Sequence, residues 1–194
     1  MPHLIFFAFL LFFLPAHAQT PQNATQWSVL PDKSHIRFTA TQMGAEAEGV
    51  FKKFDAQIFF SLENLAESRV DVTIDTSSVD TDYEKRDNTL KGQDWFYIEK
   101  YPTAKFTCSK FIFIGSATPE NGDYICQGEL TLRGVKRSLD LPFHLNIQDK
   151  TAYMTSTITL DRLPFGLGQG DWADTSIIGQ NVELDIKITA EKKD

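Results

Sequence analysis

Chemically reactive side chains are scarce in this sequence. Its 194 residues include 4 histidines, 2 cysteines and 3 methionines, and no C-x-x-C pair occurs. Beyond the first residues the histidines are His35 and His144, far apart in the chain. Catalysis needs a nucleophile with a base, a carboxylate pair or metal ligands at coordinating spacing, and the pattern shows none of these. We therefore expect no enzyme, no metal site and no cofactor.

Positive charge is also in short supply. Lys and Arg number 19 against 26 Asp and Glu, which gives a formal net charge of -7. Non-specific affinity for nucleic acid comes from clustered Lys and Arg, and no basic stripe is present. The composition argues against a nucleic-acid partner.

One long apolar run is present, from Leu4 to Leu14. It is too short to cross a bilayer as a helix, and it is followed by Pro15 and the small-residue site Ala16-His17-Ala18. Residues 1–18 are therefore predicted to be a secretory signal peptide, although the start of the chain lacks Lys and Arg. We expect cleavage near Ala18, no membrane span, and one exported domain over residues 19–194.

Apolar and polar residues alternate through most of the remaining chain. The alternation is plain in Ile36, Phe38 and Ala40, and again over residues 139–147 and 182–188, as a sheet with one buried face requires. Three strands, or four if the region of Gly49 forms its own, are predicted before residue 81. Residues 105–114 and 124–133 flank a turn and predict a hairpin.

The alternation stops between residues 81 and 106. Thr81 and Glu84 have capping-box spacing, and Gly92 sits where a helix would end. Arg86 and Asp87 could form an ion pair on this helix. We expect a short helix laid across a sheet.

Trp95 and Phe96 follow that helix and are too apolar for a solvated loop. Pro102 ends this segment before the next strand. About eight antiparallel strands with one apolar face can close as a barrel or stack as a sandwich. A helix between the two halves favours an all-β antiparallel barrel whose opening the helix covers.

Cys108 and Cys126 lie in the two segments of the predicted hairpin. They could pair across it in one register, or remain as two buried thiols, and the sequence leaves both open. A disulfide here would be worth about 3 kcal/mol in the chain-entropy model. Residues 161–180 form a long Gly-rich connection, and connections of this length tend to be functional.

Aromatic residues are abundant, with 16 Phe in the chain. Core packing explains any one of them, but together they suggest the wall of a pocket for long apolar guests. The candidate ligand-binding residues are Phe38, Met43, Phe51, Phe60, Val72, Trp95, Phe96, Leu132, Phe143, Phe165 and Trp172. Arg86, Arg133 and Arg162 are candidates to meet an anionic head group, with surface solvation as the alternative.

Several segments, in order and spacing, resemble the YceI-like family of exported lipocalin-like barrels that bind polyisoprenoid or other long-chain lipids. They are Asp32 with Ser34, Ile36 and Phe38, then TATQMG, GVFKKFDAQI, IDTSSVDT, RDNTLKGQDWF, YPTAKF, GELTLRGV and DRLPFGLGQGDWAD. His35 follows Ser34 where many relatives read His-Ser, so no role is carried over to it. The resemblance implies a lipocalin-like barrel with an apolar pocket, a periplasmic location and a homodimer.

The sequence is compatible with three functions. The leading hypothesis is a periplasmic carrier that holds and transports a polyisoprenoid or other long-chain amphiphile, such as a fatty-acyl lipid, in its barrel. The second is an enzyme acting on a prenyl lipid or quinone through Arg86 and the acidic residues near the helix. The third, a closed barrel that is structural or binds a protein partner, predicts a packed interior with no cavity.

Overall fold

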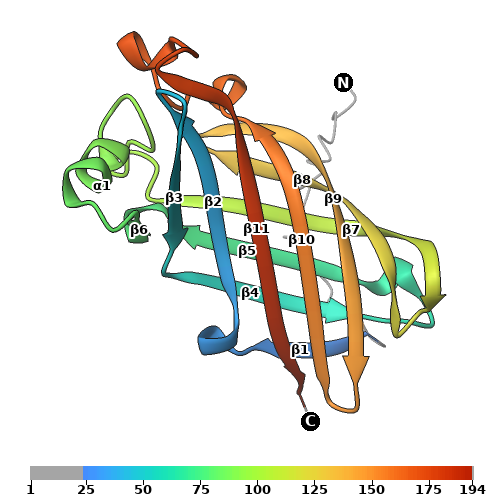
Figure 1. Cartoon of the computed structure of the whole chain (residues 1–194). Coiled ribbons are helices and arrows are strands. Elements are labelled where there is room, and N and C mark those ends of the chain that lie inside the picture. Colours follow the sequence, from blue (N-terminus) through green and yellow to red (C-terminus); the bar gives the residue numbers. More distant parts are fainter. Residues whose placement is uncertain (1–23, 194) are drawn as a thin grey trace, which may run out of the picture.

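The computed structural model describes residues 24–193, so the predicted signal peptide lies outside the described residues. Over these described residues the chain forms eleven strands and one α-helix, which Figure 1 labels. The strands are β1 (Thr25–Val29), β2 (His35–Gln42), β3 (Ala45–Phe51), β4 (Phe54–Phe60), β5 (Arg69–Asp75), β6 (Val79–Asp80), β7 (Thr103–Thr118), β8 (Asn121–Leu132), β9 (Val135–Gln148), β10 (Thr151–Asp161) and β11 (Ile178–Lys192). The helix α1 runs over Glu84–Lys91, and short 3-10 turns include η4 (Leu163–Phe165) and η5 (Gly170–Ala173).

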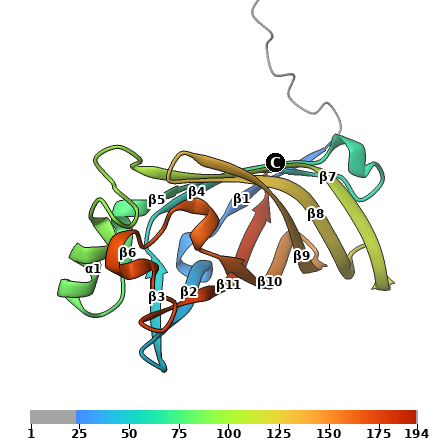
Figure 2. The same ribbon diagram turned by 90° about the horizontal axis from the view of Figure 1, so that it is seen from above.

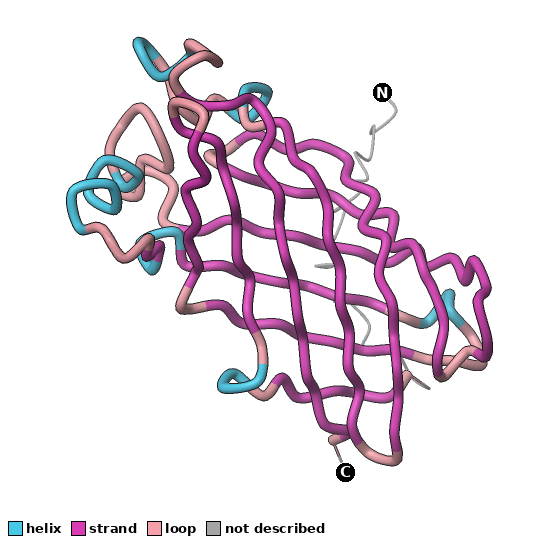
Figure 3. The backbone as a smooth tube through the Cα atoms, viewed as in Figure 1, coloured by secondary structure: helices cyan, strands magenta, loops and turns pink. Residues whose placement is uncertain are grey.

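Eight of the strands close a barrel. Their hydrogen-bonded order is β1-β4-β5-β7-β8-β9-β10-β11, and β11 returns to β1 by pairing residues 190–192 with 27–29. Neighbouring strands are antiparallel, and β2, β10 and β11 cross steeply in front of β4, β5 and β7 (Figure 3). The predicted all-β barrel of about eight antiparallel strands with a helical insert is confirmed.

Three further strands extend from the barrel at one end. β2 pairs with β11, β3 with β2, and β6 with the last residues of β3. Six strands therefore precede α1, and the expectation of three or four was too low. The two that were missed, β1 and β6, have five and two residues, too few for alternation to be recognised, whereas the Gly49 region does form a strand of its own.

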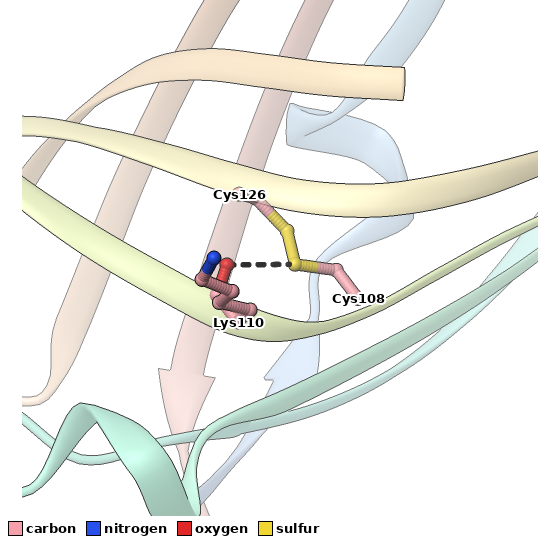
Figure 4. The surroundings of a disulfide bond; sticks show 3 residues. All are labelled: Cys108, Lys110 and Cys126. Atoms are coloured by element: carbon pink, nitrogen blue, oxygen red, sulfur yellow. Dashed lines mark hydrogen bonds between the residues drawn. A yellow bond between two sulfur atoms is a disulfide. The ribbon is translucent and has the colours of Figure 1, made fainter. Parts of the chain in front are cut away.

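The β7–β8 hairpin is confirmed and carries a disulfide between Cys108 and Cys126 (Figure 4). Cys126 pairs with Phe111, and Cys108 pairs with Gly128, because the ladder is irregular between Cys108 and Lys110. This irregularity brings the cysteines onto a diagonal with their Cα atoms 6.1 Å apart. The structure thus selects the disulfide over the two free thiols.

The helix α1 begins differently from the expected capping box. Its N-cap is Tyr83, which makes no side-chain cap, and Thr81 instead donates from its N–H and its hydroxyl to the Asp87 carboxylate at 2.9 and 2.5 Å. The capping box is wrong because Asp87, facing back toward Thr81, takes both donors. Arg86 donates from Nη2 to the Thr81 carbonyl at 2.8 Å, so its expected ion pair with Asp87 is also wrong. The helix ends as predicted at Gly92, whose N–H donates to the Thr89 carbonyl.

Candidate functional site

The barrel encloses two cavities. The larger, which we call the lid-end cavity, has a volume of about 430 Å³ and is lined in part by α1 and the 162–177 loop. Figure 2 shows α1 and this loop at the same end of the barrel. The smaller, the inner cavity, measures about 140 Å³. The lid-end cavity is lined by Ile36, Phe38, Ala40, Gln42, Ala47, Phe51, Ile74, Tyr83, Lys85, Arg86, Thr89, Leu90, Trp95, Phe96, Ala104, Leu130, Leu132, Leu160, Arg162, Leu167, Trp172, Ile178, Val182 and Leu184.

The two cavities follow one another along the strands. On β5 the inward residue Ile74 lines the lid-end cavity, and Val72, two residues away, lines the inner one. On β11 the same change occurs between Leu184 and Ile186, and Ile36 of β2 lines both cavities. Because alternate residues of a strand face the same side, these rows form one interior axis leading away from α1.

Small inward side chains create the hollow space. Ala40 and Ala47 are direct partners across β2 and β3, and Ala104 pairs with Ile74 on the opposite wall; all three alanines line the lid-end cavity. A core packed at native density would fill these positions with larger residues. The cavity therefore arises from small residues at inward positions of the strands.

Aromatic rings gather at both ends of this axis. At the lid end, Phe51 contacts Phe38 and Phe96 with centroid distances of 5.6 and 5.5 Å, and Trp95 lies 6.0 Å from Trp172. A second group, built on Tyr124, lies beside the inner cavity, and Phe60, Phe111 and Phe143 of this group line that cavity. Its members are Phe60, Phe111, Phe113, Tyr124 and Phe143.

Arg162 organises the loop that covers the lid end. Its side chain is 1% exposed, and burial lowers the pKa of its guanidinium. An arginine has five N–H donors, and here they meet five carbonyl oxygens: those of Leu167, Gly168, Trp172, Ile178 and Gly179 at 2.6 to 3.4 Å. The guanidinium also lies 5.4 Å from the Trp95 ring. This placement favours a role in holding the loop over binding a head group.

The loop is joined in turn to the segment after α1. The N–H groups of Gly168 and Gln169 both donate to the Asp94 carbonyl, at 2.8 and 2.9 Å. Arg133 donates to the Gln93 carbonyl at 2.6 Å and to the Gln169 side chain at 3.2 Å. Gly168 has a φ of +75°, and a Cβ there would meet the Arg162 guanidinium and lie 3.1 Å from the Trp95 ring. Together the loop and the segment at 93–96 form one cover, which we call the lid.

Polarity is confined to the lid-end cavity. Its polar lining side chains are Gln42, Tyr83, Lys85, Arg86, Thr89 and Arg162. Tyr83 is 56% exposed, so this side of the cavity meets solvent. The inner cavity is lined by aliphatic and aromatic side chains and by disulfide and thioether sulfur. An amphiphile with its chain inward and its head near α1 matches this gradient.

Most candidate residues from the sequence lie on these walls. Those on the lid-end cavity are Phe38, Phe51, Arg86, Trp95, Phe96, Leu132, Arg162 and Trp172, and those on the inner cavity are Phe60, Val72 and Phe143. Met43 and Phe165 line neither cavity, which corrects their placement. Met43 is 78% exposed because it turns the β2–β3 hairpin with a φ of 50°, and Phe165 is buried at 3% exposure beneath Arg137.

Sequence reasoning placed the helix over the opening and named Arg86, but it missed four other lining residues of this segment. They are Tyr83, Lys85, Thr89 and Leu90, and α1 has no fully buried residue that would mark an apolar stripe. The alanines of the hollow were also missed. Their signal was present, because they sit at inward positions of alternating strands, where large residues are usual.

The acidic residues near α1 are paired with neighbouring donors of the protein. Asp75 accepts from the N–H and hydroxyl of Ser77, which lowers its pKa, and Asp80 pairs with Lys52, which lowers the pKa of Asp80. Asp87 is occupied by Thr81. Among residues 24–193 no group of three or more His, Cys, Asp or Glu is placed to hold a metal ion. None of the helices in that range is long and apolar enough to span a membrane.

Comparison with known proteins gives a family match over nearly all of the described chain. The model of the YceI-like domain matches residues 27–190. A UPF0312 protein of Photorhabdus laumondii is 41% identical over 93 residues, and Protein YceI of Escherichia coli O157:H7 is 38% identical over 94 residues. Each alignment covers 48% of this chain and spans about half the length of the curated relative, 45% and 46%.

Solved structures agree with this match. BcnA of Burkholderia cenocepacia superimposes with a TM-score of 0.78 at 29% identity, covering 84% of this chain and 99% of BcnA. A protein of Saccharophagus degradans, described as a polyisoprenoid binding domain implicated in plant cell wall breakdown, gives a TM-score of 0.68 at 16% identity. That alignment covers 87% of this chain and 99% of the other, and it shows a shared fold.

Proposed function

The chain belongs to the YceI-like family, and from this premise we propose that its barrel binds and carries a polyisoprenoid or similar long-chain amphiphile. The observation that carries the proposal is the polarity gradient along the interior axis. Polar side chains stand at the lid end, and the inner cavity offers an apolar wall. The chain of the amphiphile would extend inward from α1, past Ile36, toward the aromatic group around Tyr124.

The size of the interior supports this role. Ligand pockets typically measure about 300–1,000 Å³, and the lid-end cavity alone, at about 430 Å³, falls in that range. Burial of a methylene group contributes about 0.8 kcal/mol. Association itself is costly, so short chains should bind weakly and longer chains much more tightly. A packed structural barrel would not contain this hollow.

Native mass spectrometry of the protein purified from its host tests the proposal. We expect a bound species whose mass fits a long-chain lipid, and saturable uptake of prenyl or fatty-acyl probes after that lipid is removed. An empty barrel together with no saturable uptake would rule out the carrier function.

Location and assembly are part of the same proposal. We place the mature protein in the periplasm after removal of residues 1–18, and the intact mass of the exported form tests that cleavage site. The family resemblance implies a homodimer. Its sedimentation coefficient should then correspond to the mass of two chains. A single-chain value at micromolar concentration would contradict it.

A further inference from the structure

We propose that the carried amphiphile has an anionic head group, a phosphate or a carboxylate, held at the lid end by Lys85 and Arg86 of α1. This inference rests on the proposed carrier function and specifies the ligand class of the same site. Its starting point is the charge of the cavity lining. Lys85, Arg86 and Arg162 line the lid-end cavity, and no Asp or Glu does, although the chain carries a net charge of -7.

The three cationic side chains differ in how many hydrogen-bond donors remain available to a ligand. Arg162 has its five donors satisfied by backbone carbonyls. Among the described residues the Arg86 side chain makes one hydrogen bond, from Nη2 to the Thr81 carbonyl, and its Nε is buried without an acceptor. A buried donor without a partner is costly, and an anionic oxygen near α1 would supply acceptors for the guanidinium.

Lys85 stands next to Arg86 on the same helix and is exposed on the solvent side of the cavity. Among the described residues, no carboxylate lies within ion-pair distance of Lys85 or Arg86. A phosphate or carboxylate between them would make charge-assisted hydrogen bonds, which are shorter and stronger than neutral ones.

The acidic side chains nearby do not neutralise this pair. Asp82 and Glu84 are exposed and do not line the cavity. Asp87 accepts from Thr81, and Asp80 is paired with Lys52. The pair Lys85 and Arg86 is therefore the cationic feature that the cavity presents to a ligand head.

Matched ligands that differ in the head group alone test the inference. Geranylgeranyl phosphate and geranylgeraniol share one chain, and palmitate and hexadecanol share another. Binding to the delipidated full-length mature protein can be followed by the fluorescence of Trp95 and Trp172, which line the cavity. Since hydrogen bonds to charged groups are each worth about tenfold or more in affinity, we expect each anion to bind at least about tenfold more tightly than its alcohol.

Substitutions assign that preference to residues. Lys85→Gln and Arg86→Gln should each reduce the anion-to-alcohol affinity ratio by about threefold or more. Lys91→Gln is the matched control, because Lys91 is on the same helix but does not line the cavity, and it should leave the ratio unchanged. Lys85 is exposed, and its side chain makes no ion pair among residues 24–193, so its variant keeps the test valid if Arg86→Gln unfolds.

The outcomes separate this inference from the carrier function. Saturable binding of anion and alcohol with equal affinity would overturn the anionic head group and leave the carrier function standing. A preference for the anion that survives both substitutions would overturn the assignment to Lys85 and Arg86. No saturable binding of any chain would overturn both. Displacement of geranylgeranyl phosphate by inorganic phosphate at equal concentration would overturn the carrier function, because the prenyl chain would then add nothing to the affinity.

Discussion

Inward-pointing alanines and aromatic residues divide the barrel interior into empty and filled space. Ala40, Ala47 and Ala104 stand where the lid-end cavity opens, whereas Tyr124 is 1% exposed and packs among phenylalanines at the other end of the axis. A ring that borders a cavity loses contacts on one side, so its contribution to stability is smaller than that of a fully packed ring. Ligand binding can restore those contacts.

Trp95 is the residue that best separates binding from stability. It lines the lid-end cavity at 8% exposure, so Trp95→Ala should weaken binding of long-chain ligands by about 1 to 3 kcal/mol, the range for losing a buried aromatic contact. Isothermal titration with a prenyl ligand measures this loss.

The control for Trp95 is Phe165→Ala. Phe165 is buried near the same end but does not line the cavity, so its loss should lower thermal stability with little change in affinity. If Trp95→Ala lowers stability by several kcal/mol while affinity stays the same, Trp95 belongs to the core and the lid is misplaced.

Tyr124 predicts a pH-dependent stability. Its hydroxyl donates to the Pro119 carbonyl at 2.6 Å, and burial raises the pKa of the phenol. Below the ordinary tyrosine pKa of about 10 both states are protonated, so the contribution is constant. Above it the unfolded chain ionises first, and stability is lost as pH rises toward the folded pKa.

Comparison with Tyr124→Phe isolates this effect. The wild type should be more stable near neutral pH by about 1 kcal/mol, the net worth of one hydrogen bond, and this advantage should shrink as the pH rises above about 10. Urea unfolding at a series of pH values measures it. A constant difference from pH 8 to 11 would show that the Tyr124 phenol ionises alike in both states.

Prediction of single residues from the sequence succeeded where alternation along a strand decides which face of the sheet a side chain occupies. Phe38, Phe60, Val72 and Phe143 were placed inward by alternation, and they line the cavities. The prediction failed for Met43 because this residue lies in a two-residue turn, where alternation no longer determines the direction of a side chain. Arg162 could not be recognised either, since its five carbonyl partners come from a loop whose path depends on the folded barrel.

At the scale of elements, the lid is assembled from two segments far apart in the chain. The Asp94 carbonyl accepts from Gly168 and Gln169, while Arg162 holds the far side of the same loop. Ordering a connection of this length costs conformational entropy, and these hydrogen bonds offset that cost. The lid is therefore expected to order as one unit.

Arg162→Met should release the lid. It leaves five buried or partly buried carbonyls without their donor, and the free energy of unfolding should fall by more than about 3 kcal/mol, given about 1–3 kcal/mol for each unsatisfied buried group. Arg137→Met is the matched control, because Arg137 is exposed and makes one hydrogen bond to the same loop. Hydrogen exchange should show lost protection at residues 167–179 in the first variant alone. Equal protection in both variants would contradict the role assigned to Arg162.

The disulfide supports the β7–β8 hairpin at its irregular point. Cys108 and Cys126 are separated by 18 residues, so the substitution of both by alanine should lower the free energy of unfolding by about 3 kcal/mol. Urea unfolding of the wild type with and without dithiothreitol should show a similar difference. A wild type insensitive to dithiothreitol under fully unfolding and refolding conditions would contradict the bond.

For the whole molecule, the closure of the barrel and its hollow interior both follow from the pairing of the strands. The barrel closes because β1 bridges β4 and β11, and it stays hollow because the closed ring holds its walls apart. The sequence predicted the barrel and its lid from alternation and from the single helical interruption. The sequence could not predict that the interior is divided into two cavities. That division depends on which inward side chains meet across the barrel, and the register of the strands decides this.

A crystal structure of the protein soaked or co-crystallised with a long-chain amphiphile, brominated at the end of its chain, would locate both ends of the ligand. We predict an anomalous bromine peak on the interior axis, in or next to the inner cavity, with the head group at the lid end near α1. A bromine peak on the outer surface of the barrel, or a ligand lying in the opposite direction with its bromine beside Lys85, would contradict this binding mode.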